Sequence, residues 1–240
     1  MATSDNAPDA PDAKDAKNGP DFTYEAQWCD KGYVIGVDEA GRGPWAGPVC
    51  AAAFWIRPDK RALIPSSLND SKKISAKKRA LIETDLRTQK DDAIHDFESA
   101  TASVAEIDTH GILQANFLAM GRAVEGLAQR LLKTDPLNLA ATGQCQIAHI
   151  FIDGNLLPPL SYPASAIIKG DGRVLSIAAA SIIAKQTRDA IMAELHKAYP
   201  FYGWDRNQGY GTRAHMQGLD HHGICEHHRT SFAPIKKRLS

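Results

Sequence analysis

The chain has 240 residues, of which 43% are hydrophobic and 23% are charged, and its formal net charge is zero. This length and composition fit one soluble globular domain with small appendages, and the neutral balance excludes global electrostatic steering toward an anionic polymer. We see no apolar leader and no apolar run near the ~20 residues that a membrane-spanning helix needs. The sequence therefore predicts a cytoplasmic protein without a membrane contact.

The cysteines are far apart in the sequence and form no CxxC pair. This spacing predicts reduced thiols rather than disulfides or a four-cysteine zinc site. The four positions are Cys29, Cys50, Cys145 and Cys225.

The N-terminal half begins with a segment that lacks bulky side chains, most clearly over residues 1–20. Such a segment buries too little surface to offset its ordering entropy, so we expect a disordered tail over 1–28 and one folded domain over 29–240. Apolar runs then predict two strands joined by a glycine-rich turn at Gly41–Gly47, as in a hairpin. The elements expected next are strands at Tyr33–Val37 and Val49–Ile56, a helix from Ser75 to about Thr88, a strand at Ala93–Phe97, and a helix capped by Ser103 and Glu106.

The C-terminal half is predicted to alternate helices and strands. In chain order we expect a helix at Ile112–Leu132, strands at Ile147–Ile152 and Ala164–Ile168, and helices at Val174–Ala198 and Thr212–His222. Strands that lead, with helices interspersed, are typical of an α/β or α+β layered domain.

Acidic residues stand at the ends of three apolar segments. Asp38 and Glu39 follow the first predicted strand, Asp153 follows the fourth, and Asp171 precedes the most apolar helix. If these strands pair, the carboxylates converge, repel one another and raise at least one pKa. Two hard divalent cations would offset that charge and support phosphodiester hydrolysis. The alternative is that each acid is a turn residue or helix cap, as Asp171 would be at a helix N-terminus.

Seven segments, spread in order over residues 37–232, carry a further signal. They are Val37–Val49 (VDEAGRGPWAGPV), Leu68–Ile74 (LNDSKKI), Phe151–Asn155 (FIDGN), Lys169–Lys185, Tyr199–Gly203 (YPFYG), Gly209–Thr212 (GYGT) and His228–Phe232 (HRTSF). Together they resemble ribonuclease HII, the bacterial type 2 ribonuclease H. Trp45 and Gly172 stand where that family often has other residues.

The resemblance implies a ribonuclease H-like α/β fold, in which helices flank a mixed β-sheet, with a helical C-terminal part. It implies a metal-dependent endonuclease that hydrolyses the RNA strand of RNA–DNA hybrids, including single ribonucleotides embedded in duplex DNA, and leaves 5′-phosphate and 3′-hydroxyl ends. It also implies that Mn²⁺ or Mg²⁺, with two ions in the site, is bound by four carboxylates, those of Asp38, Glu39, Asp153 and Asp171.

The same resemblance implies a substrate-binding set. Gly41, Arg42 and Gly43 match the loop whose backbone recognises the ribose 2′-hydroxyl, the group that distinguishes RNA from DNA at one nucleotide. Tyr210 matches a tyrosine that packs on the sugar at the RNA-to-DNA junction. Ser71 and Lys72 are expected to contact phosphate, and of Lys169 and Lys185 the sequence does not say which one does.

Five histidines and Cys225 crowd the last part of the chain, yet their spacing fits no standard zinc pattern. We therefore expect a structural or phosphate-facing role for His228. The histidines are His215, His221, His222, His227 and His228.

Two other functions stay open at this stage. Another nuclease of the same broad fold, of the resolvase or integrase type, would not need to test for a 2′-hydroxyl, and a non-catalytic nucleic-acid-binding module would not need metal to bind. A monomer is the default expectation. The basic residues at 233–240 suit either another duplex contact or a replication-clamp contact, between which the sequence does not choose.

Overall fold

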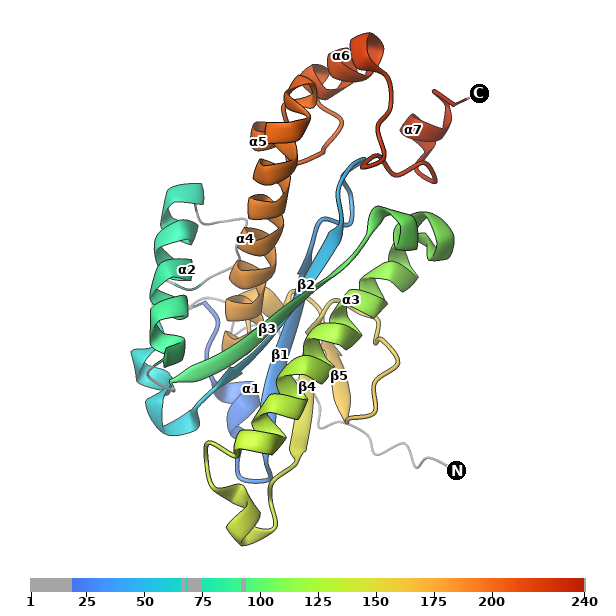
Figure 1. The fold of residues 1–240 in the computed structure, drawn as a ribbon. Helices are drawn as coiled ribbons and strands as arrows, with labels where there is room; N and C mark the ends of the chain where they lie inside the picture. The colour runs from blue at the N-terminus through green and yellow to red at the C-terminus, as the bar shows by residue number, and fades with distance from the viewer. Residues whose placement is uncertain (1–18, 66–67, 69–74, 92–93, 240) are drawn as a thin grey trace.

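The computed structural model describes residues 19–65, 68, 75–91 and 94–239. Its centre is a five-stranded mixed sheet with the order β3-β2-β1-β4-β5, and helices cover both faces (Figure 1). The strands are β1 (Tyr33–Ala40), β2 (Val49–Ile56), β3 (His95–Ala102), β4 (Ile147–Asp153) and β5 (Ala164–Ile167). The α-helices are α1 (Thr23–Ala26), α2 (Ala76–Asp91), α3 (Val104–Thr134), α4 (Leu175–Ala198), α5 (Trp204–Asn207), α6 (Arg213–His222) and α7 (Ala233–Lys236). Short 3₁₀ turns lie at η1 (Pro58–Leu63), η2 (Leu139–Thr142), η3 (Gly170–Gly172) and η4 (Pro200–Tyr202).

Strand β1 is the middle strand and decides where the acids lie. It pairs antiparallel with β2, which confirms the expected hairpin, and parallel with β4. β1 is longer than the predicted Tyr33–Val37, because it continues through Asp38 and Glu39 to Ala40. The acids are therefore part of the strand and do not follow it.

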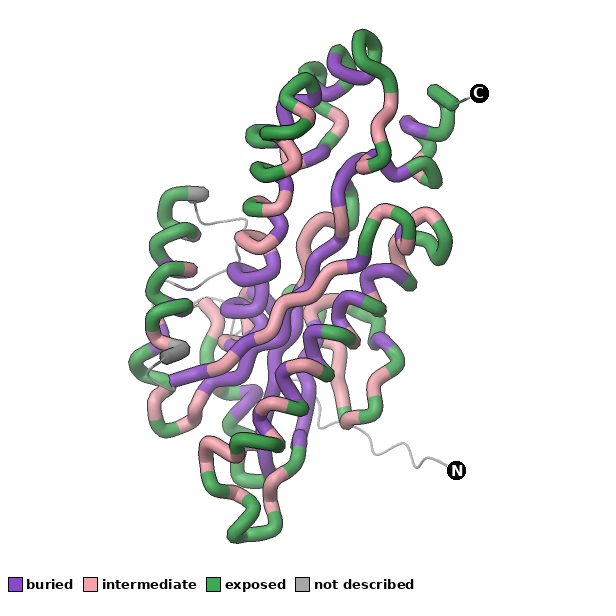
Figure 2. The backbone as a smooth tube through the Cα atoms, in the orientation of Figure 1, coloured by how far each residue is buried: buried purple, intermediate pink, exposed green. Residues whose placement is uncertain are grey.

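Two apolar layers hold the helices against the sheet. On one face, Tyr33, Ile35 and Val37 pack with buried residues of α3, and on the other face residues of β2 pack with α2 and α4. Figure 2 shows this buried centre running along the strands and along the inner sides of α3 and α4. Gly36 permits the closest approach, because a Cβ at this position would lie 2.4 Å from the backbone of Ser176 and Ile177.

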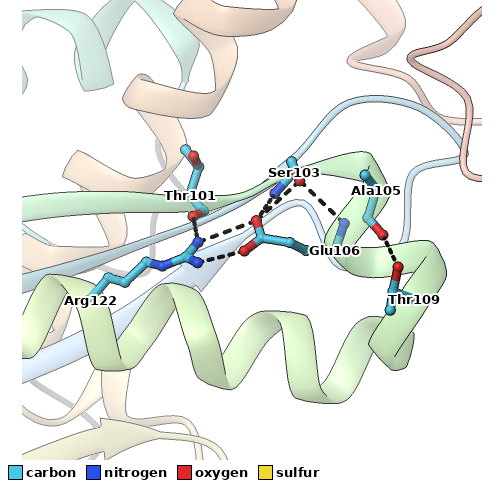
Figure 3. Close-up of polar contacts among 6 residues, drawn as sticks. All are labelled: Thr101, Ser103, Ala105, Glu106, Thr109 and Arg122. Carbon is cyan, nitrogen blue, oxygen red and sulfur yellow. Dashed lines mark hydrogen bonds and ion pairs between the residues drawn. The ribbon is translucent and has the colours of Figure 1, made fainter.

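The start of α3 is fixed by the capping box that the sequence predicts. Ser103 Oγ accepts a hydrogen bond from the Glu106 backbone N–H at 3.2 Å, and Glu106 Oε2 accepts one from the Ser103 N–H at 2.8 Å (Figure 3). Arg122, four turns along, binds both Glu106 and the carbonyl of Thr101. Gly111 (φ 77°, ψ 156°) kinks the helix, which agrees with the two helical segments expected from the sequence.

The N-terminal boundary that the sequence predicts is wrong. Residues 19–28 contain helix α1 and pack on the domain, although they were assigned to the tail. Tyr24 is buried beside Phe151, and Leu175 donates its backbone N–H to the carbonyl of Asp21 at 2.9 Å. The aromatic side chains of this segment supply the apolar surface that residues 1–20 mostly lack, which offsets the entropy of ordering it. Residues 1–18 lie outside the described part of the chain.

The C-terminal region is helical, as expected, and has its own small core around Trp204, Leu219 and Ile235. In Figure 1 it lies beside the hairpin end of β1 and β2. All four cysteines are free, as the sequence predicts. Within the described residues, no helix has both the length and the apolar character needed to cross a membrane.

Candidate active site

The acids of β1 and β4 lie at one edge of the sheet. Val37 is in register with Ile152 on the parallel neighbour, so the next residues along the two strands are Asp38 and Asp153. The carboxyl ends of parallel strands meet at the same edge, which is why acids far apart in the sequence come together here. The expected convergence of these acids is therefore present in the fold.

Asp38 and Glu39 point to opposite faces of the sheet, because successive strand residues alternate. Asp38 lies on the α4 side, where its carboxylate accepts hydrogen bonds from Ser181 and, at 2.7 Å, from the Glu39 backbone N–H. It is only 5% exposed. Burial, followed by the charges of Glu39 and Asp153, raises the pKa of Asp38 well above its usual value.

Glu39 lies on the α3 side. Its carboxylate pairs with the Arg42 guanidinium at 3.4 Å and accepts a hydrogen bond from the buried amide of Asn116 on α3. Burial raises the pKa of Glu39, and the charge of Asp153 adds to this effect, while Arg42 and Asn116 oppose it. Glu39 is therefore bound by donors of its own, separate from those of Asp38.

Asp153 and Asp171 meet through the turn η3. The Gly170 backbone N–H donates to Asp153 Oδ1 at 2.6 Å, and the next residue is Asp171, which is 7% exposed. A Cβ at Gly170 would lie 2.6 Å from the side chain of Ile177, so this turn packs tightly under α4. All four predicted acids are thus on neighbouring elements, three of them within electrostatic reach of one another.

Among the residues described, no three His, Cys, Asp or Glu side chains already share an arrangement that would hold a metal ion. Asp38, Glu39 and Asp153 each accept a hydrogen bond from a different donor. The donor set itself suits Mg²⁺ or Mn²⁺, which prefer carboxylate oxygen. Burial is the main cause of the raised pKa values of Asp38 and Glu39, and the charge of Asp153 adds to both shifts.

The glycine-rich loop after β1, residues 41–48, is held from behind by two buried arginines. Arg229 donates to the carbonyls of Gly41, Arg42, Gly47 and Pro48, at 2.6 to 3.1 Å. Arg188 of α4 donates to the carbonyls of Pro48, Ala46 and Gln208, at 2.9 to 3.0 Å. Because these carbonyls are bound on the protein side, the loop has a fixed shape before any substrate arrives.

Tyr210 lies against this loop. A Cβ on Gly43 would lie 3.4 Å from the ring of Tyr210. Tyr210 itself is 52% exposed. Gly41 has φ +94°, and a Cβ there would collide with Arg188, so glycine is required. Trp45, one of the departures noted in the sequence, binds the carbonyl of Gly209 through its backbone N–H at 2.8 Å and joins the loop to the Tyr210 segment.

The residues predicted to contact phosphate differ in what the structure shows of them. Ser71 and Lys72 lie outside the described residues. Lys169 is exposed two residues before Asp171, whereas the Lys185 ammonium pairs with Asp189 on the same helix. Of the two lysines, Lys169 is therefore the better placed to meet an anion.

Sequence reasoning did not single out Arg188, Arg229, Asn116 or Glu25. Arg229 lies inside the HRTSF motif, and Arg188 is a cation in the most apolar predicted helix, so both carried a signal. Asn116 and Glu25 carried none, because an amide in an amphipathic helix and an acid near a presumed tail are ordinary features of a solvated surface.

A cavity of about 490 Å³ lies elsewhere, along α3, lined by Phe117, Arg122 and Pro159 among others, and none of the four acids lines it.

Comparisons with known proteins identify the family of this chain. The sequence model of the family Ribonuclease HII matches residues 35–235. The Ribonuclease HII of Jannaschia sp. (strain CCS1) is 49% identical over 223 residues, which cover 92% of this chain and 98% of that protein. Two solved structures share the fold. Bst-RNase HIII in complex with Mn²⁺ has a TM-score of 0.61 at 18% identity, over 99% of this chain and 76% of that one. The RNase HII of the PCNA:RNase HII complex from Archaeoglobus fulgidus has a TM-score of 0.56 at 21% identity, over 83% of this chain and 95% of that one.

The expected class, an α/β protein of ribonuclease H-like fold with a mixed sheet and flanking helices, is confirmed. The chain belongs to the ribonuclease HII family.

Proposed function

We propose that this protein is an endonuclease that hydrolyses the RNA strand of RNA–DNA hybrids, including single ribonucleotides embedded in duplex DNA. One observation carries the proposal. Only Ala40 separates the acids Asp38 and Glu39 from the 41–48 loop, so carboxylates and loop occupy the same end of β1. A site that combines clustered carboxylates with a rigid, glycine-rich backbone suits phosphodiester hydrolysis beside a recognised ribose.

We propose that Asp38, Glu39, Asp153 and Asp171 bind two Mn²⁺ or Mg²⁺ ions. Such ions would activate a water and stabilise the leaving oxygen, which would leave 5′-phosphate and 3′-hydroxyl ends. The protein's own part is to bring three elements to one edge and to bury Asp38, whose raised pKa a nearby cation would lower. The Mn²⁺ complex of Bst-RNase HIII supports the choice of metal.

In the proposed substrate complex, the backbone of Gly41, Arg42 and Gly43 binds the 2′-hydroxyl and Tyr210 packs on the adjoining sugar. The loop's rigidity supports this assignment, since a site built to bind a hydroxyl rejects the analogue that lacks it when its polar groups are left unpaired. Lys169 would meet a phosphate, and Ser71 and Lys72 stay predicted phosphate contacts.

The test is cleavage of end-labelled duplex DNA that carries one ribonucleotide, beside an all-DNA duplex, with Mn²⁺, Mg²⁺ or chelator. We expect one cut beside the ribonucleotide, only with metal, and none in the control. Equal cutting of both duplexes would favour a resolvase- or integrase-type nuclease. Metal-independent binding of both without any cleavage would favour a binding module.

The RNase HII of Archaeoglobus fulgidus forms a complex with PCNA. We extend the proposal to a replication clamp as a partner of the C-terminal segment, where Leu239 is 61% exposed beside basic residues. Deletion of residues 237–240 would then abolish clamp binding in gel filtration and leave cleavage intact. The monomeric state and cytoplasmic location expected from the sequence stay predictions.

A further inference from the structure

Two histidines are buried behind Tyr210 and have no place in the function proposed above. His215 of α6 is 0% exposed and His228, before Arg229, is 1% exposed. Their Nε2 atoms are 3.0 Å apart, and the rings of Trp204 and Tyr202 enclose them. A direct contact between two imidazoles is stable only if one ring donates and the other accepts.

The surrounding groups fix which ring donates. His228 Nδ1 lies 3.1 Å from the Cys225 backbone N–H, a donor, and 3.3 Å from the Cys225 carbonyl, an acceptor, so these two contacts do not decide the tautomer. The Trp204 indole N–H, which can only donate, makes His215 Nε2 an acceptor, so the proton of His228 is on Nε2. That Nε2–H donates to His215 Nε2, which also accepts from the Trp204 indole N–H at 3.3 Å. His215 therefore has its proton on Nδ1 and donates it to the carbonyl of Tyr210 at 3.0 Å.

Both rings are held neutral. Burial, to which the neighbouring His215 adds, lowers the pKa of His228 to about 4, and burial also lowers the pKa of His215. A proton added to His215 Nε2 would face two donors, the Trp204 indole N–H and the His228 Nε2–H. The chain of bonds runs in one direction, from Cys225 through both rings to Tyr210.

This chain joins the two sides of the candidate sugar site. At one end His215 holds the Tyr210 carbonyl, and the Tyr210 ring lies beside Gly43. At the other end His228 precedes Arg229, whose guanidinium holds the carbonyls of Gly41 and Arg42. The backbone of this strip is also bridged to the loop, because Ala46 pairs with His228.

We propose that the His215–His228 pair is a positioning element that sets the spacing between Tyr210 and the 41–48 loop, and thereby the preference for ribose over deoxyribose. The inference rests on the proposed function, since it gives the pair a role in the same site. Neither histidine touches substrate or acid. The pair acts through Tyr210 on one side and through Arg229 on the other.

The sequence offers a matched pair of variants. His215→Asn places an amide N–H where Nδ1–H lies, and so keeps the bond to Tyr210, whereas His215→Leu removes it at similar size. We expect His215→Leu to reduce kcat/KM on a duplex with one ribonucleotide by about 10- to 100-fold, the size of effect that a displaced positioning group produces. His215→Asn should recover most of that loss. The His221→Leu change, at an exposed position on the same helix, is the control and should have no effect.

The decisive readout is selectivity. With full-length protein, Ca²⁺ in place of the cleaving metal and fluorescence anisotropy, we would measure the ratio of Kd for all-DNA duplex to Kd for the one-ribonucleotide duplex. His215→Leu should lower that ratio toward one, while its Mn²⁺ affinity, measured by calorimetry without substrate, stays that of the wild type. A wild-type ratio retained in folded His215→Leu would overturn the proposal and leave the proposed function standing.

A second measurement covers a variant that does not fold. In wild-type protein, long-range ¹H–¹⁵N spectra of the histidines at pH 7 should show His215 protonated on Nδ1 and His228 on Nε2. The opposite tautomers, or a charged ring, would overturn the inference without reference to activity. A wild-type enzyme that binds both duplexes equally would overturn this inference together with the proposed ribose recognition.

Discussion

The sheet edge that carries Asp38, Glu39 and Asp153 lies next to the 41–48 loop, but the charged groups of the two regions have opposite signs and different partners. At the edge, Asp38 is buried and Glu39 half-buried beside Asp153, and the pKa values of Asp38 and Glu39 are raised because burial and like charges disfavour the ionised form. Behind the loop, Arg188 and Arg229 are buried, and backbone carbonyls accept the hydrogen bonds that both guanidinium groups donate. Burial, with Arg188 nearby, lowers the pKa of Arg229 to about 9.

The loop and the acids of the sheet edge meet different structural requirements. A loop that must present a fixed backbone gains from internal donors that order it in advance, at the cost of burying two cations. A site that must bind cations gains from carboxylates that have few positive neighbours, at the cost of mutual repulsion. The 41–48 loop already has its hydrogen-bond donors in the folded protein. At the acids of the sheet edge, in contrast, we expect a bound divalent cation to stabilise the folded state.

The sharpest way to break this comparison is to remove one acid. We expect Asp153→Asn to fold but to lose at least about 1000-fold in metal-supported cleavage, equivalent to about 4 kcal/mol of transition-state stabilisation. The reason is that Asp153 lies between the β1 acids and the Asp171 turn. Single-turnover kinetics measure the loss, and the exposed Asp59→Asn is the control. Full activity in Asp153→Asn would remove the metal role of this edge.

The loop side is tested by Arg229→Met. The variant leaves buried carbonyls of the 41–48 loop without a donor, so the free energy of unfolding should fall by about 3 kcal/mol. Urea denaturation followed by circular dichroism measures the change. Arg206→Met, at an exposed position, should change stability by less than about 0.5 kcal/mol. Equal effects of the two changes would contradict a bracing role for Arg229.

Glu25 of α1 is another buried acid, and its titration tests how burial affects stability as the pH changes. Its Oε1 accepts hydrogen bonds from the Ser176 N–H and Oγ–H at the start of α4, its Oε2 has no hydrogen-bond partner among the residues that the structure describes, and burial raises its pKa to about 7. Between about pH 4.5 and 7 the folded state thus holds a proton that the unfolded state has lost, so this group lowers stability as pH rises.

Glu25→Gln removes that titration and keeps one acceptor for Ser176. We expect the variant to be more stable than wild type by about 1 to 2 kcal/mol at pH 8, with the difference vanishing near pH 4. Thermal unfolding at a series of pH values provides the measurement, and Glu194→Gln, an exposed site, should show no such trend. A pH-independent difference would mean that Glu25 is ionised in the fold.

The smallest expected change in stability is that of an Asp38 variant, which tests the acids at the sheet edge directly. The raised pKa of Asp38 means that the fold penalises the charged form, so Asp38→Asn should increase the metal-free stability by about 1 kcal/mol while abolishing cleavage. Mn²⁺ should then raise the melting temperature of wild type more than that of the variant. A loss of stability in Asp38→Asn would show that its bonds to Ser181 and Glu39 outweigh the burial of its charge.

Much of the fold can be predicted from local sequence patterns. The apolar runs predict the five strands, Ser103 and Glu106 predict the start of α3, and acids after apolar runs predict which strand ends converge. Family motifs around Asp38, Asp153 and Tyr210 add the candidate site. These signals are readable because hydrophobic periodicity and capping depend on residues within a few positions of one another.

Other features depend on which distant segments meet, and only the tertiary structure decides them. Asp38 and Glu39 face opposite sides of the sheet because β1 continues through them, and their pKa values follow from burial under α4 and α3. Residues 19–28 dock because Tyr24 and Glu25 find partners some 125 to 150 positions away. The arginines behind the loop and the tautomers of the buried histidines likewise follow from long-range contacts. Desolvation and hydrogen-bond direction are properties of the packed interior, which no local pattern encodes.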